Sequence, residues 1–333
     1  MKPEDQTEQP KGEDSQNDEK DLVGEFLSKE AKTNDKLDPD FRFGYVDIIG
    51  RPNVGKSTLL NRILGQKVSI VTAKPQTTRQ KLAGIKTTPE GQVVYVDTPG
   101  IHHSAKRALN KYMNRVAQAS FRDVDLVMFL VEAGKWTRQD DFVSRALKAA
   151  DVPVMLVLNK IDEVADKESL LKFVEKDIQV DQYDSVMMIS AKNGSGVDAL
   201  EKRVLEKLPF SRPFYDEDQF TDRSERFLAA EMVREQLTLR LHQELPYAIT
   251  VQIEEFKRAG KLLTIGAIIW VERDSQKQIA IGKNGIVLKQ VGTKARIVLE
   301  ELFGEKVFLR LWVKVSPDWS DSDRLIERFG YTD

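Results

Sequence analysis

No cysteine occurs in this sequence of 333 residues, which excludes disulfide bonds and zinc sites with thiolate ligands. Histidine is also scarce, with three residues, so a metal centre built from imidazole ligands is not expected. No apolar run approaches the ~20 residues needed to span a bilayer, and the longest candidate is Leu262 to Val271. The acidic, polar N-terminus is typical of neither a secretory signal nor a cationic transit peptide. These absences are compatible with a reducing cytoplasm.

Charge is distributed unevenly along the chain. Residues 1–40 carry six lysines and thirteen Asp or Glu residues, a balance of −7, and few large apolar side chains. Such a segment buries too little surface to offset the entropy lost on ordering, which predicts a disordered acidic tail. The remaining residues have a balance of +5. A mildly basic body is weak evidence for a nucleic-acid partner, because ordinary surface charge gives the same balance.

Short apolar runs alternate with helical stretches over residues 41–208. The runs of strand length are residues 45–49, 93–96, 124–131, 154–158 and 187–189, and helices are expected at 56–64, 105–121 and 140–150. Nearly continuous apolar strands separated by helices indicate a parallel sheet that is covered on both faces. The pattern therefore predicts an α/β domain with a doubly wound, mostly parallel sheet.

The alternation stops after residue 208. Residues 209–222 contain two prolines and several acidic side chains, which is typical of a linker. The remaining residues, 223–333, follow another order: a helix at 224–243, strands at 247–256 and 261–272, a short helix, a longer helix at 286–302 and a strand at 307–315. This order predicts a small α+β domain.

A P-loop pattern lies at the junction of the first strand and the first helix. It comprises Gly50, Arg51, Pro52, Asn53, Val54, Gly55, Lys56, Ser57 and the following Thr58. The glycines let backbone N–H groups converge on phosphates, and the helix N-terminus adds a positive dipole. Lys56 is expected to reach the β- and γ-phosphates, and the Ser57 hydroxyl to bind Mg²⁺. Alone, this motif indicates a nucleoside triphosphate without specifying the base.

Further motifs follow in order at predicted strand ends. They are Asp97, Thr98, Pro99 and Gly100 with Ile101 behind them, then Asn159, Lys160, Ile161 and Asp162, and finally Ser190, Ala191 and Lys192. Asp97 is placed to hold Mg²⁺ through a water molecule, and the Gly100 N–H can meet the γ-phosphate. Asp162 can accept hydrogen bonds from guanine N1 and N2, which adenine does not offer. The Ala191 N–H can donate to guanine O6, so the motifs together predict a guanine-specific site.

A switch segment is expected between the first two motifs, at Gln76, Thr77, Thr78, Arg79 and Gln80. A threonine in such a segment closes onto Mg²⁺ when the γ-phosphate is present, and Thr78 is favoured over Thr77. Ile101 stands where small signalling GTPases place a glutamine that orients water, so slow intrinsic turnover is expected.

Several residues could take over the role of that glutamine, and the sequence does not decide between them. Arg79 is either an arginine finger or a charge on the switch surface, and His102 and His103 are either a general base or mobile switch residues. Asn53 either holds a K⁺ ion that offsets charge developing on the phosphates or simply stabilises the loop turn.

A second binding motif lies between two predicted helices of the C-terminal half. Gly282, Lys283, Asn284 and Gly285 match the GXXG loop of KH domains, which clamps about four nucleotides through their backbone. The motif is common by itself, but the surrounding order of helices and strands favours the KH interpretation. Lys289, Lys294 and Arg296 would extend the basic surface along the next helix, unless they form only a solvated helix face.

All these motifs together resemble the Era family of bacterial GTPases, which joins a GTPase domain to a C-terminal type II KH domain. The resemblance covers residues 41–333 and includes residues 244–247, 271–274, 311–315 and 329–331. It implies GTP hydrolysis with Mg²⁺, binding near the 3′ end of 16S rRNA, and a role in maturation of the 30S subunit. It also implies a monomeric cytoplasmic protein that associates peripherally with the inner membrane. The role of the acidic tail stays open.

Two other classes of GTPase are the alternatives. A tRNA-modification GTPase shares a similar nucleotide domain, but it carries a different accessory domain and a C-terminal cysteine. A signalling or trafficking GTPase without RNA would be supported by a lipidated cysteine. The absence of cysteine from this sequence argues against both classes.

Overall fold

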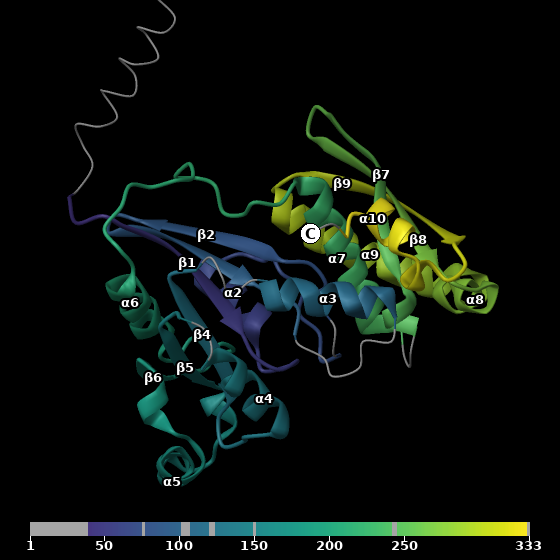
Figure 1. Ribbon diagram of the computed structural model, residues 1–333. Helices are drawn as coiled ribbons and strands as arrows, with labels where there is room; N and C mark the ends of the chain where they lie inside the picture. Colours follow the sequence, from purple (N-terminus) through teal and green to yellow (C-terminus); the bar gives the residue numbers. More distant parts are fainter. Residues whose placement is uncertain are drawn as a thin grey trace, which may run out of the picture.

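The computed structural model describes residues 39–74, 77–100, 107–119, 124–148, 151–241 and 245–331. Within these ranges the chain forms two separate sheets, each packed against helices (Figure 1). The predicted tail up to residue 38 lies outside the described residues. So do the site predictions at Gln76, Ile101, His102 and His103.

The first sheet is mostly parallel, and its strand order is β2-β3-β1-β4-β5-β6. The strands are β1 (Arg42–Ile49), β2 (Leu82–Thr88), β3 (Gly91–Asp97), β4 (Leu126–Glu132), β5 (Val154–Asn159) and β6 (Ser185–Met188). Every neighbouring pair is parallel except β2 and β3, which pair antiparallel. The predicted doubly wound, mostly parallel fold is confirmed, with β2 as an additional edge strand.

Helices cover both faces of this sheet. The helices packed on it are α2 (Lys56–Leu64), α4 (Arg138–Leu147), α5 (Lys167–Asp177) and α6 (Val197–Lys207), whereas α3 (Ala108–Ala119) packs with the C-terminal segment. Two short 3-10 helices are η2 (Ile161–Glu163) and η3 (Val180–Gln182). Alternate residues of β4 enter different cores, so that Met128 packs with α2 and α6 while Phe129 packs with α4 and α5. A strand buried on both faces needs apolar residues at every position, which explains its continuous apolar run.

The second sheet has the order β7-β8-β9. Its region comprises α7 (Glu225–Arg240), η4 (Leu245–Ala248), β7 (Thr250–Ala259), β8 (Leu262–Val271), α8 (Asp274–Ile281), η5 (Lys283–Gly285), α9 (Ile286–Phe303), β9 (Lys306–Val315), η6 (Trp319–Asp321) and α10 (Asp323–Arg328). Strands β7 and β8 pair antiparallel, whereas β8 and β9 pair parallel. Side chains from one face of this sheet share a core with α7, α8 and α9. The predicted order of helices and strands in an α+β domain is confirmed.

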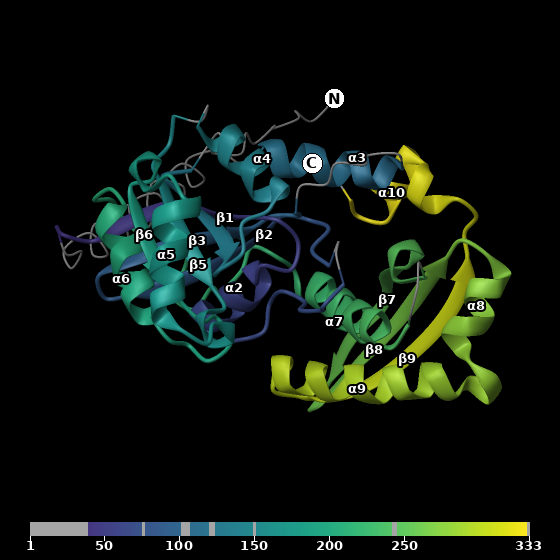
Figure 2. The same cartoon turned by 90° about the horizontal axis from the view of Figure 1, so that it is seen from below.

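The regions built on the two sheets are connected in sequence by residues 209–222, and α3 of the first region also contacts the second. Residues 209–222, expected to be a linker, run along the first sheet and form bridges between Arg42 and Phe210 and between Gly84 and Thr221. Helix α3 packs against the C-terminal segment, where Tyr112 meets Tyr331 with ring centroids 5.9 Å apart. Figure 2 shows α3 beside α10. No helix among the described residues is long and apolar enough to cross a membrane.

Candidate nucleotide site and RNA-binding loop

The P-loop follows β1, and its last residues, Lys56 and Ser57, begin helix α2. Gly55 adopts φ +104°, and a side chain there would lie 2.3 Å from Asn159 Nδ2, so the tight turn requires glycine. Helix α2 then begins at Lys56, and its free N–H groups face the loop. The Lys56 amine donates to the Gly50 carbonyl at 3.0 Å, and burial lowers the pKa of Lys56. An anion that reaches this loop meets a desolvated cation and a helix N-terminus together.

The side chain of Arg51, a P-loop residue, forms ion pairs with carboxylates of the protein itself. It forms ion pairs with Glu132 at 2.7 Å and with Asp140 at 3.2 Å, and Lys160 also lies 3.5 Å from Glu132. Arg51 and Asp140 are buried. The side chain of Arg51 therefore ties the loop to β4 and α4, and only its backbone remains for a phosphate.

Oxygen atoms gather around Asp97 at the end of β3. Its Oδ2 accepts hydrogen bonds from Ser57 at 2.7 Å and Ser69 at 2.8 Å, and Thr78 lies 3.3 Å away. Its Oδ1 is buried and has no hydrogen-bond partner among the described residues. Burial raises the pKa of Asp97. Carboxylate and hydroxyl oxygens are the ligands that Mg²⁺ prefers, so this donor set fits the ion.

The two switch threonines have different surroundings. The Thr78 hydroxyl lies 3.0 Å from that of Ser57, whereas the Thr77 hydroxyl bonds to Thr72 at 2.7 Å and to the Lys74 carbonyl at 2.7 Å. Thr78 thus belongs to the oxygen cluster, while Thr77 stabilises its own loop.

The guanine motifs meet at the ends of β5 and β6. Asn159 is buried and donates to the Val54 carbonyl at 2.7 Å, which joins the base motif to the P-loop. The Ala191 N–H donates to Asn159 Oδ1 at 2.9 Å, so in this structure it does not point freely toward a base. The hydroxyl of Ser190 donates to Asp162 at 2.5 Å and lowers the pKa of that carboxyl. An exposed, ionised Asp162 suits the donors of guanine.

A single cavity connects the parts of the nucleotide site. Its volume is about 550 Å³. The residues predicted for the site that line it are Pro52, Asn53, Gly55, Lys56, Ser57, Thr58, Thr77, Thr78, Gly100, Lys160 and Lys192. Asn53 adopts φ 66°, and its side-chain amide donates to the Ala73 carbonyl at 2.9 Å, which links the P-loop to the segment before the switch.

Arg79 is buried and is not among the residues that line the nucleotide cavity. Its side chain is buried and donates to the carbonyls of Ile249 at 2.7 Å and Pro246 at 2.8 Å, beside Tyr331 at 3.4 Å. The expectation of a finger or a surface charge is corrected for this structure. The residue next to Thr78 instead anchors the switch to the second region.

Helix α7 holds the same segment from its other side. Buried Arg234 donates to the Thr77 carbonyl at 2.6 Å, and Glu235 accepts from the Val71 N–H at 2.9 Å. Lys74 donates to the Thr238 carbonyl at 2.5 Å. We call these contacts, together with those of Arg79, the domain clamp. Sequence reasoning missed it because its partners lie more than 150 residues away along the chain.

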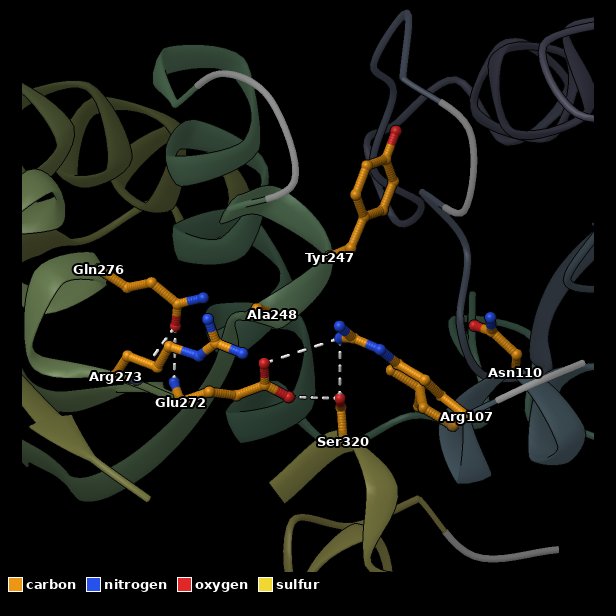
Figure 3. A pocket seen from close by; sticks show the side chains of 9 residues that line it. Arg107, Asn110, Tyr247, Ala248, Glu272, Arg273, Gln276 and Ser320 are labelled. Carbon is orange, nitrogen blue, oxygen red and sulfur yellow. Dashed lines mark hydrogen bonds and ion pairs between the residues drawn. The ribbon is translucent and has the colours of Figure 1, made fainter. Parts of the chain in front are cut away.

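A smaller cavity lies where α3 meets the second region (Figure 3). Its volume is about 380 Å³. Buried Glu272 accepts a hydrogen bond from Ser320 and pairs with Arg107 at 3.6 Å, so that β8, η6 and the start of α3 converge there. This polar contact was not predicted, because residues 271–274 entered only as part of the family resemblance, without a partner for Glu272, and Arg107 lies in no motif.

The GXXG sequence forms the connection between α8 and α9. A side chain at Gly282 would lie 2.4 Å from Val287 Cγ2, and its φ is +74°, so glycine is required there. Lys283 and Asn284 are exposed at the tip. Lys289 and Lys294 line a groove of about 620 Å³ between α7 and α9, and Arg296 lies 3.9 Å from Glu300. The loop offers backbone and cationic groups to a phosphate chain.

Strand-end motifs on a mostly parallel sheet, followed by this helix–loop–helix on a small sheet, define a P-loop GTPase joined to a KH domain. The family model described as "50S ribosome-binding GTPase" matches residues 45–160, and the model described as "KH domain" matches residues 244–320. The region built on the first sheet is called the GTPase domain below, and the region from α7 onward is called the KH domain.

Curated relatives match almost over their full length. The chain is 52% identical over 288 residues to GTPase Era of Stenotrophomonas maltophilia (strain R551-3), covering 86% of this chain and 97% of that protein. It is 51% identical over 300 residues to GTPase Era of Pseudomonas aeruginosa (strain LESB58), covering 90% and 98%. The chain belongs to the Era family, and it is therefore a GTPase.

Solved structures agree with this assignment. A single-residue variant of Aquifex aeolicus Era bound to GDP·AlF4⁻ is 38% identical, with a TM-score of 0.84, and the match covers 88% of this chain and 100% of that chain. Era in complex with MgGDPNP and nucleotides 1506–1542 of 16S ribosomal RNA is 39% identical, with a TM-score of 0.83 and the same coverage. The resemblance predicted from the motifs is confirmed.

Proposed function

We propose that this GTPase binds the 3′ region of 16S rRNA through its KH domain and assists assembly of the 30S subunit. The observation that carries the proposal is the likeness, over 88% of this chain, to Era in complex with MgGDPNP and nucleotides 1506–1542 of that RNA. The exposed GXXG loop supports it, since such loops clamp the nucleotide backbone. Membership of the Era family also supports a cytoplasmic protein with peripheral membrane association, which fractionation of cell lysates would test.

The nucleotide site is proposed to comprise the P-loop together with the motifs at 97–101, 159–162 and 190–192. Mg²⁺ would be held by Ser57, Thr78 and Asp97, whose oxygens already gather around one point. When bound, the ion neutralises charge on the β- and γ-phosphates. Lys56 adds a buried cation to the same phosphates, and Asp162 selects guanine by accepting its two donors.

The domain boundaries are part of the same proposal. The GTPase domain extends over residues 41–208 and the KH domain over residues 223–333, with residues 209–222 between them. The bridges of residues 210 and 221 to β1 and β2 indicate that this connection packs against the GTPase domain. Limited proteolysis should therefore cut slowly within 209–222, and rapid cleavage there would argue against a docked connection.

Nucleotide state is proposed to gate RNA binding through the domain clamp. The γ-phosphate orders the switch segment of GTPases, residues 76–80 here, which is called switch I. In this structure the residues around Thr78 are bonded to the KH domain through Arg79 and Arg234. A change in switch I must therefore break or remake contacts with α7 and residues 246–249. The clamp gives the two sites a shared element, which coupling between them requires.

Asn53 is proposed to help hold a K⁺ ion during hydrolysis. Its side chain lines the nucleotide cavity, and its amide nitrogen is used by the Ala73 carbonyl. The carbonyl oxygen of the same side chain is then the group suited to a monovalent cation. Such an ion would offset charge that develops on the phosphates, the role that an arginine finger has elsewhere.

The proposed RNA function is tested with the double variant Lys283→Asp, Asn284→Asp. Two carboxylates at the loop tip repel the phosphates that must lie there, so affinity should fall several-fold or more. Filter binding to an RNA of nucleotides 1506–1542 measures it, with thermal unfolding as the control for folding of the KH domain and intrinsic GTP hydrolysis as the control for the GTPase domain. Unchanged RNA binding by the double variant would reject the KH loop as the RNA site.

A further inference from the structure

Cationic and aromatic side chains alternate along the outer face of β9. Lys306, Phe308, Arg310, Trp312 and Lys314 occupy every second position of this strand and share one face. The intervening apolar residues Val307, Leu309, Leu311, Val313 and Val315 pack into the core with α7, α8 and α9. The alternating row therefore lies on the face of the sheet opposite those helices, along an edge strand.

The aromatic members of the row are open to solvent. Phe308 is 52% exposed and Trp312 is 41% exposed. The guanidinium carbon of Arg310 lies 5.8 Å from the Phe308 ring centroid and 5.5 Å from that of Trp312. A cation is thus held between two exposed rings, close enough to interact with both.

Gly266 on the neighbouring strand β8 makes room for the indole. It pairs with Arg310, and a side chain at this glycine would lie 3.2 Å from Trp312 Cζ3 and 3.1 Å from Glu255 Cβ. A glycine inside a strand commonly marks such a close approach by another group. The Trp312 ring can therefore lean over the sheet while much of the residue remains exposed.

The surrounding charges favour an anion. Lys257 of β7 is 77% exposed and shares this face with Lys314 and Arg310, as the strand register shows. The carboxylate of Glu255 pairs with Arg310 and lies 3.6 Å from Lys257. Cations thus outnumber carboxylates around the rings of β9. The Lys314 ammonium lies 5.8 Å from the Trp270 ring, which belongs to β8.

At one end of the row, the neighbouring ring of Trp270 is covered by other residues of the protein. Phe329, just beyond α10, packs on Trp270 with ring centroids 5.4 Å apart, and the Trp270 indole nitrogen donates to Gln252 at 3.1 Å. Trp270 is therefore engaged by the protein itself. Phe308 and Trp312 are the rings that remain available, with Arg310 and Lys314 beside them. We call these four residues the outer platform.

We propose that the outer platform binds single-stranded RNA, with bases stacked on Phe308 and Trp312 and phosphates paired with Arg310 and Lys314. Aromatic rings on an open sheet with cations between them are how sheet-based modules bind unpaired bases, and stacking tolerates any base. The inference rests on the proposed RNA function and extends it. The GXXG loop takes about four nucleotides on the helical side, and the platform takes a further segment.

The test compares fluorescein-labelled oligouridines of about 6 and about 20 nucleotides, since single-stranded sites of this kind cover roughly 4–16 nucleotides. The stacking variant is Phe308→Leu, Trp312→Leu, which keeps an apolar group over Gly266. Its matched control is Phe214→Leu, an exposed aromatic residue of the connection between the domains. The charge variant is Arg310→Gln, Lys314→Gln, and its control is Lys172→Gln, at an exposed lysine of α5. All proteins are full length.

The stacking variant should bind the long oligomer about tenfold more weakly than the wild type, with little change for the short one. The charge variant should lower the slope of log affinity against log salt by about 0.7 for each phosphate that it no longer neutralises. Both controls should behave as the wild type. Single Phe308→Leu, at an exposed position, preserves the test if the double variant unfolds, and thermal unfolding of each variant reports folding of the KH domain.

Two negative outcomes are distinguishable. If both platform variants bind the long oligomer as the wild type does while Lys283→Asp, Asn284→Asp binds it weakly, the platform proposal is overturned and RNA binding by the KH loop stands. If the loop variant also binds normally, the proposed RNA function fails as well. Weak binding by the platform variants, with both controls intact, supports the outer platform as an RNA site.

Discussion

The nucleotide site and the proposed RNA-binding surfaces of this protein are built in opposite ways. Around the nucleotide site, Lys56, Asp97 and Asn159 are buried and bonded to other protein atoms. On the KH domain, Lys283 and Asn284 are exposed, and so are Phe308 and Trp312. The first site is preorganised by its own core, whereas the second presents groups that a flexible strand can reach.

This difference separates specificity from affinity. A polar group that becomes buried against the wrong partner on binding loses the full free energy of an unmade hydrogen bond, so the nucleotide site should discriminate sharply. Exposed cations and rings add small, nearly independent contributions that depend on salt and tolerate many sequences. Substitutions in the nucleotide site should therefore have large effects on specificity, whereas substitutions on the KH domain should have smaller, salt-dependent effects on RNA affinity.

The largest effect is expected for Asp162→Asn. The substitution turns one acceptor into a donor that faces the donors of guanine, so GTP affinity should fall roughly 100-fold or more. Xanthosine triphosphate should gain affinity, because its C2 oxygen is an acceptor. Calorimetry with GTP, ATP and xanthosine triphosphate measures the three affinities. If the variant bound GTP as tightly as the wild type does, Asp162 would not be the residue that recognises guanine.

A second prediction concerns Arg79, where the two regions meet. Arg79→Gln leaves buried carbonyls of Pro246 and Ile249 without their donor, which should lower stability by about 2 kcal/mol. The dependence of RNA affinity on bound nucleotide should shrink to about twofold or less. Thermal unfolding and RNA titrations with GDP or a GTP analogue provide the two readouts.

Arg107→Gln is the matched control for Arg79→Gln. Arg107 also joins the domains, through Glu272, but its side chain is 50% exposed. Glu272 is buried but keeps its hydrogen bond from Ser320, and the half-exposed Arg107 is screened by solvent, so the loss of stability should be smaller than for Arg79→Gln, and coupling should stay near that of the wild type. Equal effects of the two substitutions would show that general contact between the domains matters, and not the connection of Arg79 to the switch.

The smallest expected effect concerns hydrolysis in different salts. If Asn53 helps to hold K⁺, GTP hydrolysis should be several-fold faster in potassium than in sodium at matched ionic strength. Asn53→Ala should abolish that difference while GTP affinity changes little. Rates are measured with and without RNA. Equal wild-type rates in the two salts would leave Asn53 with only its hydrogen bond to Ala73.

Local patterns were sufficient to predict most of the fold. Strands β1, β3, β4, β5 and β9 follow runs whose apolar periodicity is set by burial on one or both faces. Strand β2 was missed because Lys86, Thr87 and Thr88 make its second half polar, as an edge strand permits. Helix α10 was missed because it is short and is stabilised by packing on α3.

The part of the nucleotide site that consists of sequence motifs was predictable. Residues 50–57, 97–100 and 159–162 follow strands, so their order along the chain already places them at one edge of the sheet. The burial of Arg79 was not predictable, because its partners are carbonyls at 246–249 that carry no side-chain signal. The role of Arg51 depends in the same way on Glu132 and Asp140.

RNA affinity measured against nucleotide state tests the link between the two regions most directly. The full-length protein is titrated with an RNA of nucleotides 1506–1542, once with Mg²⁺ and a non-hydrolysable GTP analogue and once with Mg²⁺ and GDP. Because switch I is bonded to the KH domain through Arg79 and Arg234, the complex with the GTP analogue should be clearly tighter. Equal affinities in the two nucleotide states would contradict nucleotide gating through the domain clamp.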